Sequence, residues 1–290
     1  MQVTVAVTQM ACSWDIEQNV ARAETLVSQA AAAGANLVLL QELFETPYFC
    51  IDTKPEHFDL AKELAHQPTI ARMQQLAKKH EMVIPVSFFE KAGLAHFNSI
   101  AVIDADGSVA GCYRKSHIPD FPLYEEKYYF SPGDTGFQVF ETRFGRLGIG
   151  ICWDQWFPEA ARVMTLMGAQ MLLYPTAIGS ELDKPDFDSK EHWQMTMRGH
   201  AAANILPVLA SNRVGQEVSG NLSMDFYGSS FIANETGQLV CEADRTSETV
   251  LTHTFDLNAI ATYRREWGVF RDRRPDLYGP LLSLDGKSGT

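Results

Sequence analysis

Hydrophobic residues in this chain recur with two periods, and the two kinds of segment alternate near the N-terminus and again around residue 150. A period of two predicts strands, whereas apolar positions three and four residues apart predict helices. The strands expected from this pattern are 3–8, 36–41, 82–89, 98–104, 109–114, 145–151, 171–175, 206–211, 226–233, 238–242 and 250–255. The expected helices are 19–33, 69–80, 189–203 and one that opens at Pro158. The pattern predicts an α/β (α+β) chain whose mixed sheets carry helices on their outer faces.

The alternation continues without an obvious boundary. No linker, low-complexity run or block of like charges interrupts it, so we expect one domain over residues 1–290. Residues 263–290 contain several arginines and mix polar with apolar positions, which is typical of an arm. We therefore expect a C-terminal arm over residues 263–290.

One stretch, residues 145–158, places a cysteine where a buried strand meets a helix. Isoleucine and leucine alternate with glycine up to Cys152, and Pro158 then opens a helix. Backbone N–H groups and the helix dipole at such a turn favour the thiolate, which is the reactive form of cysteine. A small buried thiol is the commonest fate of a cysteine, so this stretch alone leaves an inert thiol and a nucleophile equally open.

Three polar or reactive side chains follow directly on buried-type strands: Glu42, Lys115 and Cys152. The ligand crevice of open α/β folds lies beyond the carboxyl ends of the strands, so these side chains can converge. Taken singly, an acid such as Glu42 is more often a helix cap or a surface charge, and a lysine such as Lys115 is more often solvated. Together they support one reaction, in which Glu42 takes the thiol proton and Cys152 attacks a carbonyl carbon. Lys115 and the backbone N–H of Trp153 would then stabilise the oxyanion.

Other reaction centres fit the sequence less well. Cys152 lacks the second glycine of a G-x-S-x-G elbow, and no P-loop, strand-linked G-x-G-x-x-G or metal-spaced Cys/His cluster is present. We therefore expect hydrolysis without a cofactor or a metal. His117 is the one histidine in a candidate catalytic loop; a lone histidine is more often structural, but spacing alone leaves a Cys–His hydrolase open.

Charge and cysteine usage narrow the partners. A net charge of −12 disfavours nucleic acids and anionic membranes, and no apolar run reaches the ~18 residues that a membrane helix needs. The N-terminus shows no export signal, and five scattered cysteines argue for free thiols in a reducing compartment. We expect a cytoplasmic protein with no nucleic-acid or membrane partner.

Three segments, 40–44 (LQELF), 113–120 (YRKSHIPD) and 145–154 (GRLGIGICWD), resemble the signature blocks of the nitrilase (carbon–nitrogen hydrolase) superfamily. They stand in the same order and spacing, and the resemblance extends over essentially the whole chain. It implies a four-layer αββα sandwich. It also implies assembly into homo-oligomers, dimers or larger, in which the C-terminal arm is a plausible exchange element.

The same resemblance implies a Glu-Lys-Cys triad at Glu42, Lys115 and Cys152. A second glutamate of the superfamily, which orients the lysine and the substrate, matches Glu126, with its neighbour Glu125 as the fallback. The superfamily cleaves nitriles, amides and N-carbamoyl groups, so the triad does not fix the substrate.

The residues beyond the cysteine limit the substrate. Relatives that hydrolyse N-carbamoyl amino acids place arginines there to hold a carboxylate, whereas this chain has Asp-Gln-Trp-Phe at 154–157. Acids and aromatic residues are expected around the pocket instead, a lining that suits an alkylammonium group. The expected substrate-binding residues are Tyr48, Asp120, Tyr124, Trp153 and Glu181.

A closer resemblance concerns the reaction. Residues 88–90, 96–100, 174–181 and 267–278 resemble the subfamily that hydrolyses N-carbamoylputrescine to putrescine, carbon dioxide and ammonia in polyamine synthesis. Glu181, with Asp120 as a second candidate, would meet the distal ammonium of this small cationic substrate. The bulky segment 120–123 departs from the glycines of plant-like relatives, which leaves the preferred chain length open. The alternatives are another ω-amidase or ureido-hydrolase, or a non-catalytic binding member of the fold.

Overall fold

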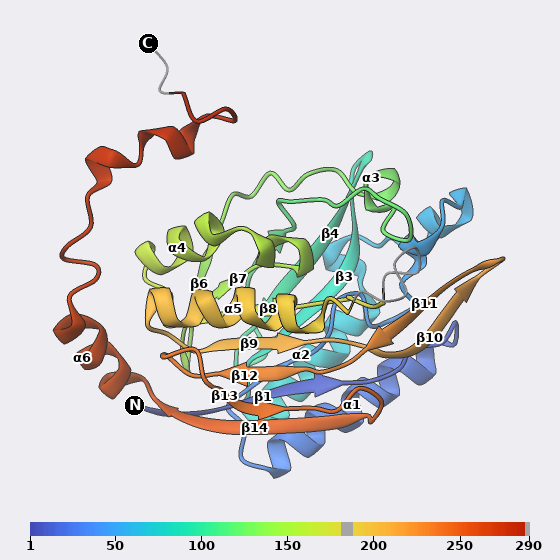
Figure 1. The fold of residues 1–290 in the computed structure, drawn as a ribbon. Helices are drawn as coiled ribbons and strands as arrows, with labels where there is room; N and C mark the ends of the chain where they lie inside the picture. Colours follow the sequence, from blue (N-terminus) through green and yellow to red (C-terminus); the bar gives the residue numbers. More distant parts are fainter. Residues whose placement is uncertain (181–187, 288–290) are drawn as a thin grey trace.

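In the computed structural model, which describes residues 1–180 and 188–287, two sheets face each other and helices cover both outer faces (Figure 1). The first sheet has the order β14-β1-β2, and a parallel bridge between Leu37 and Val83 continues it into β3-β4-β5. Its strands are β1 (Gln2–Gln9), β2 (Leu37–Leu39), β3 (Ile84–Ala92), β4 (Ala95–Ile103), β5 (Val109–Arg114) and β14 (Thr249–Asp256).

The second sheet has the order β13-β12-β9-β8-β7-β6, with β7, β8 and β9 parallel at its centre. Its strands are β6 (Val139–Thr142), β7 (Gly145–Ile149), β8 (Met171–Pro175), β9 (Val208–Ser211), β12 (Phe231–Ala233) and β13 (Leu239–Glu242). A separate hairpin pairs β10 (Val214–Ser219) with β11 (Leu222–Tyr227).

Helices α1 (Ile16–Ala32) and α2 (Pro68–His80) cover the first sheet, and α4 (Pro158–Leu166) and α5 (Lys190–Asn204) cover the second (Figure 1). The sequence explains where α2 and α4 begin: Pro68 and Pro158 occupy first-turn positions, where no backbone N–H is needed for a hydrogen bond within the helix. A short helix α3 (Glu126–Tyr129) lies in the long loop after β5. Helix α6 (Leu257–Trp267) leads into a C-terminal segment that runs outside the layered body (Figure 1).

Three apolar cores hold these layers together. One lies between the sheets and includes Val5 and Leu39 from the first sheet and Ile149 and Leu173 from the second. The other two pack each helical pair on its own sheet. Because both faces of the central strands are covered, these strands are apolar on both sides. The α/β class and the αββα sandwich expected from the sequence are confirmed.

Several regions differ from the sequence expectation. Strand β6 and helix α6 were not predicted, and the first residues of the expected arm, 263–267, belong to α6. The strand predicted at 226–233 is two strands, because Gly228 and Ser229 take positive φ values of 53° and 58° between β11 and β12. The hairpin before this break was not predicted. Its strand β10 buries Glu217, which pairs with buried Arg213 at 2.7 Å, so the buried face does not read as apolar. Because a charged residue occupies a buried position of β10, the alternation of apolar and polar residues that predicts a strand is not visible there.

Two further features bear on the setting of the protein. All five cysteines are free thiols. Within residues 1–180 and 188–287, no helix has the length and apolarity to cross a lipid bilayer.

Strand β7 has to be slim because α4 packs closely on it. A Cβ atom added at Gly148 would lie 2.8 Å from Leu172 Cδ2 and 3.0 Å from Met164 Cβ. We expect Gly148→Ala to lower the free energy of unfolding by about 1–3 kcal/mol through overpacking, measured by urea denaturation. Gly199→Ala in α5 is the matched control, since its new methyl meets open space and replaces a poor helix former. Equal destabilisation by both changes would contradict this account.

Candidate active site

Cys152 stands at the junction between the second sheet and α4. Strand β7 ends at Ile149, and Cys152 opens a 3₁₀ turn, Cys152–Trp156, just before α4. Its φ of +41° lies in the left-handed region that non-glycine residues seldom occupy, and such strain concentrates at functional sites. The side chain is buried, and its Sγ donates to the carbonyl oxygen of Ala177 at 3.7 Å.

Lys115, one residue beyond β5, lies between two carboxylates. Its Nζ is 3.0 Å from Glu42 Oε1 and 2.8 and 2.6 Å from the two oxygens of Glu126. All three side chains are completely buried. Further donors fix the carboxylates: Asn98 Nδ2 donates to Glu42 Oε1 at 2.6 Å, and the Tyr48 hydroxyl donates to Glu126 Oε1 at 2.5 Å. The structure therefore brings together three of the four residues expected to form the catalytic group.

The second oxygen of Glu42 has a different environment. Glu42 Oε2 is buried, and within the described residues it has no hydrogen-bond partner. An unsatisfied buried oxygen is costly, so it is a natural acceptor for a proton or a water molecule. The arrangement thus leaves one oxygen of Glu42 bound to Lys115 and the other free to react.

Charge in this cluster is unbalanced, with one ammonium facing two carboxyl groups. Burial opposes the charge on Lys115, yet Glu126 and Glu42 raise the pKa of its ammonium well above the usual range. Burial also raises the pKa of the Glu126 carboxyl to about 7, against the pull of Lys115. Lys115 is therefore a fixed cation, and Glu126 titrates near neutrality.

The thiol of Cys152 does not follow the sequence expectation. Burial, and next the charge of Glu42, raise the pKa of Cys152 well above its ordinary value, although Lys115 opposes the shift. A 3₁₀ turn of five residues supplies little dipole to offset this desolvation. The expectation that the turn alone favours the thiolate is wrong. Burial therefore favours the thiol form of the sulfur at rest.

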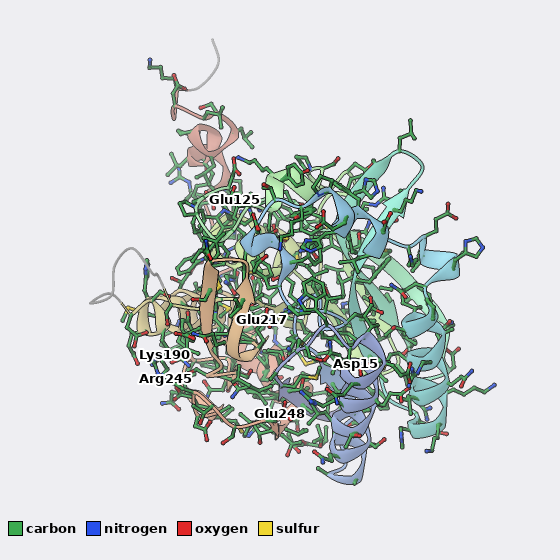
Figure 2. All side chains as sticks on the ribbon, turned by 90° about the vertical axis from the view of Figure 1, so that its right-hand side faces the viewer. Asp15, Glu125, Lys190, Glu217, Arg245 and Glu248 are labelled. Atoms are coloured by element: carbon green, nitrogen blue, oxygen red, sulfur yellow. The ribbon has the colours of Figure 1, made fainter. Side chains whose placement is uncertain are left out.

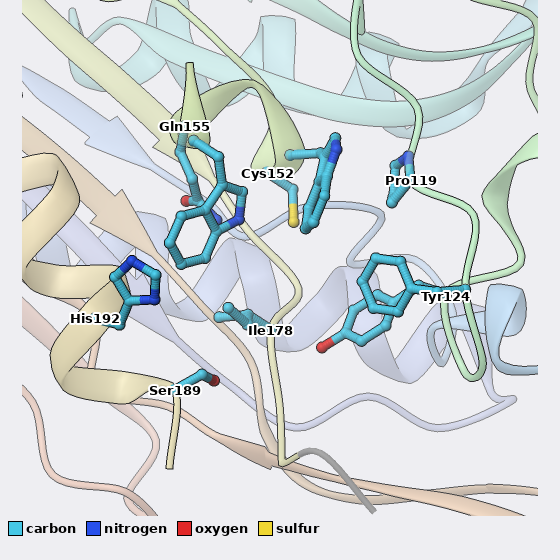
Figure 3. Close-up of a pocket in the computed structure, with 10 residues that line it drawn as sticks. Pro119, Tyr124, Cys152, Gln155, Ile178, Ser189 and His192 are labelled. Carbon is cyan, nitrogen blue, oxygen red and sulfur yellow. The ribbon is translucent and has the colours of Figure 1, made fainter. Parts of the chain in front are cut away.

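A cavity of about 230 Å³ opens onto Cys152 (Figure 3). Its wall is mainly aromatic: the Phe121 ring centroid lies 4.8 Å from that of Tyr124 and 5.3 Å from that of Trp153. The Tyr124 hydroxyl accepts from the backbone N–H of Gly179. The described residues that line the cavity are Pro119, Phe121, Tyr124, Cys152, Trp153, Gln155, Trp156, Ile178, Ser189 and His192.

The expected substrate-binding residues occupy different places. Tyr124 and Trp153 line the cavity, whereas Tyr48 is buried beside Glu126 and does not line it. Asp120 lies at the surface, with its carboxylate 4.0 Å from Lys127 Nζ, and it is not among the described residues that line the cavity. Glu181 lies outside the described residues.

Of the two neighbouring glutamates in the loop, Glu126 contacts Lys115. Glu125, labelled in Figure 2, is partly exposed and donates its backbone N–H to the carbonyl oxygen of Cys50. The one-turn helix α3 begins at Glu126, which separates the directions of the two side chains. Glu126 is thus the glutamate that the geometry favours.

His117 has a partner of its own. Its Nδ1 lies 2.7 Å from Asp154 Oδ1, and its ring stacks on Phe157 with centroids 3.6 Å apart. It is not among the described residues that line the cavity at Cys152. This geometry favours a structural role over that of a base paired with the thiol.

Sequence reasoning missed two groups that support Glu42. Buried Arg213 donates to the carbonyl oxygens of Glu42 at 2.7 Å and Leu43 at 3.1 Å. Its ion-pair partner Glu217, labelled in Figure 2, accepts the backbone N–H of Tyr48. The signal for Arg213 was its place two residues after the buried strand β9, but its contacts lie 170 residues away in sequence.

The buried charges predict how stability depends on pH. Lys115→Met leaves Glu42 and Glu126 without their cation, and breaking a buried pair in this way costs about 3–5 kcal/mol. Burial raises the pKa of the Glu126 carboxyl to about 7 even beside the lysine, so without Lys115 this carboxyl takes up a proton more readily in the folded than in the unfolded state. The loss of stability should therefore be smallest below pH 5 and grow as pH rises through 7.

Urea denaturation of wild type and variant at several pH values measures this dependence. Lys127→Met is the control, because it removes an exposed ammonium, and its stability should stay within about 0.5 kcal/mol of wild type. A loss in Lys115→Met that is the same at pH 5 and pH 8 would argue against the charged cluster.

Comparison with known proteins agrees with this geometry. The family model described as carbon–nitrogen hydrolase matches residues 4–265. An N-carbamoylputrescine amidase from Arabidopsis thaliana is 58% identical over 289 residues, 98% of this chain and 97% of the relative. A citrullinase from Francisella tularensis subsp. tularensis is 52% identical over 97% of this chain and 98% of its own length.

Among solved structures, a carbon–nitrogen hydrolase from Helicobacter pylori G27 superposes with a TM-score of 0.91 at 39% identity. The match covers 98% of this chain and 99% of the other. The signature segments, the αββα layers and the family match agree. The chain belongs to the carbon–nitrogen hydrolase family of the nitrilase superfamily.

Proposed function

We propose that the protein is a cysteine-dependent amidohydrolase that converts N-carbamoylputrescine and water to putrescine, carbon dioxide and ammonia. The observation that carries this proposal is the buried Lys115 between Glu42 and Glu126, with Glu42 Oε2 left free. The relatives named N-carbamoylputrescine amidase support the substrate, since they match almost the whole chain. The reaction belongs to polyamine synthesis from arginine by way of agmatine.

The first step forms a covalent bond. Glu42 accepts the thiol proton while the Cys152 sulfur attacks the ureido carbonyl carbon. Burial raises the pKa of the thiol, so a carboxylate base is needed for this proton transfer. Two groups stabilise the oxyanion: the fixed positive charge of Lys115 and the backbone N–H of Trp153. This N–H lies near the start of the 3₁₀ turn, where backbone donors have no partner within the turn.

Collapse and hydrolysis complete the reaction. Glu42 returns its proton to the departing nitrogen, and the carbon–nitrogen bond breaks to leave a carbamoyl thioester on Cys152. Glu42 then takes a proton from water, whose oxygen attacks the thioester and releases the thiol. The carbamic acid that results loses carbon dioxide, and the products are the same whichever nitrogen leaves first.

The cavity supports a cationic substrate in preference to an anionic one. Its described lining holds no lysine or arginine to receive a carboxylate, and aromatic faces at Phe121, Tyr124 and Trp153 attract an alkylammonium group. We retain Glu181 as the proposed partner of the distal ammonium. Asp120 is a weaker choice, because its carboxylate faces Lys127 at the surface.

A ureido-hydrolase with another substrate is the second candidate, favoured by the 52% identity to a citrullinase. Citrulline shares the ureido group but ends in an amino-acid carboxylate. The absence of a cation in the described cavity lining argues against that substrate.

Ammonia release from a panel distinguishes these candidates. The panel holds N-carbamoylputrescine, citrulline, N-carbamoyl-β-alanine, a short amide and a nitrile, each assayed with wild type and with Cys152→Ala as the blank. We expect the highest kcat/KM for N-carbamoylputrescine, because the cavity pairs aromatic faces with a cation, and no release by Cys152→Ala. Preference for the amide or nitrile would overturn the substrate, and release by Cys152→Ala would overturn the nucleophile.

We also propose that this single-domain, cytoplasmic protein assembles into a homo-oligomer through its C-terminal arm. A groove of about 710 Å³ lies between the arm and α4–α5. Apolar side chains there remain uncovered, with exposed fractions of 48% for Leu166, 62% for Leu281 and 92% for Leu282. Exposed leucines gathered in a groove that also holds charged residues are consistent with a protein interface.

Sedimentation velocity tests this assembly. The wild type should sediment well above its 32.3 kDa chain mass, and Leu166→Glu should shift it toward the monomer by placing a charge in the groove. Leu94→Glu, at the exposed tip of the β3–β4 hairpin, should leave the mass unchanged. A monomeric wild type would refute the assembly.

A further inference from the structure

The carboxylate of Asp154 is completely buried and accepts four hydrogen bonds. Its Oδ2 accepts from the backbone N–H of Ile151 at 2.9 Å and from the hydroxyl of Tyr113 at 2.8 Å. Its Oδ1 accepts from both the backbone N–H of His117 at 3.0 Å and the ring Nδ1 at 2.7 Å. Every donor belongs to a segment that carries a residue of the proposed catalytic group.

The positions of these donors are paired. Lys115 lies between Tyr113 and His117, and Cys152 lies between Ile151 and Asp154 itself. Tyr113 belongs to β5 of the first sheet, whereas Asp154 follows β7 of the second. One carboxylate therefore ties the lysine segment to the nucleophile turn across the boundary between the two sheets.

This tie requires a carboxylate. Donors approach both oxygens, so an amide would turn an NH₂ group toward one of the donor pairs. Asp154 also packs closely against the end of the preceding strand, since a Cβ atom added at Gly150 would lie 3.0 Å from Asp154 Cβ. The strained φ of +41° at Cys152 needs contacts of this kind to persist.

We propose that Asp154 is a positioning residue that sets the place of the Lys115 ammonium relative to the Cys152 sulfur. It acts through Tyr113, His117 and Ile151 and does not itself touch the substrate. The inference rests on the proposed function, because it assigns Asp154 to the reaction of that same site.

Two readouts test this role in Asp154→Asn. Misplacement of the lysine should lower kcat by roughly 10²-fold and leave KM nearly unchanged, because the substrate cavity is not altered. The second readout is alkylation of Cys152 by iodoacetamide, followed by peptide mass, and it needs no substrate. If the Lys115 ammonium stabilises the Cys152 thiolate less well, alkylation at pH 7 should be slower. The midpoint of the alkylation rate against pH should then move to higher pH.

The substrate-free readout separates this inference from the proposed function. Slower alkylation in a protein that hydrolyses none of the panel compounds would support the positioning role while refuting the reaction. Tyr113→Phe is a second variant in case Asp154→Asn does not fold, since it removes one of the four donors and keeps the charge. Tyr113→Phe should also lower kcat, by roughly tenfold, and should also slow alkylation of Cys152.

A matched control separates position from stability. Thr165→Ala removes a buried hydroxyl of α4 that donates to Ala161 at 2.7 Å, away from the cavity. It should lower the melting temperature without changing alkylation of Cys152. The proposal is overturned if Asp154→Asn, or the folded Tyr113→Phe, alkylates with the wild-type pH profile or loses no more kcat than Thr165→Ala.

Discussion

The ion cluster of Lys115, Glu42 and Glu126 is the constraint on which the site depends, because three charges without solvent must satisfy one another. Removing such groups from water costs several kcal/mol each, and close contacts of 2.6–3.0 Å offset that cost only while the geometry holds. The excess carboxyl keeps the lysine charged. Among the described residues Glu42 Oε2 has no hydrogen-bond partner, so this oxygen can accept a proton.

The sheets hold this cluster because they bring three strand ends to one place. Glu42 follows β2 and Lys115 follows β5 in the first sheet, while Cys152 follows β7 in the second. The apolar core between the sheets fixes their separation, so side chains from both meet with little freedom. Burial disfavours the charged form of the Cys152 sulfur and therefore raises the pKa of its thiol. Burial therefore favours a protonated sulfur at rest, and in the reaction that we propose Glu42 takes its proton.

Much of this arrangement could be predicted from local patterns. Period-two and helical segments predicted mixed sheets with helices on their outer faces, and the family resemblance implied the four layers. The polar residues at strand ends predicted that Glu42 and Lys115 can meet. The remainder depended on contacts distant in sequence. Arg213 reaches the loop after β2, and Asp120 turns to Lys127 at the surface, which no spacing indicates. The thiol prediction failed for a related reason, since burial is a property of the packed site and not of the turn alone.

The central claim is that Cys152 carries a covalent intermediate whose formation and hydrolysis both need the carboxylate of Glu42. The most direct measurement is the mass of the Cys152 peptide after acid quench during turnover of N-carbamoylputrescine, compared between wild type and Glu42→Gln. The account predicts a carbamoyl-type adduct on Cys152 of the wild type and little or none in Glu42→Gln, because the amide cannot accept the thiol proton. An adduct formed by Glu42→Gln at the wild-type rate, or an adduct on a residue other than Cys152, would contradict it.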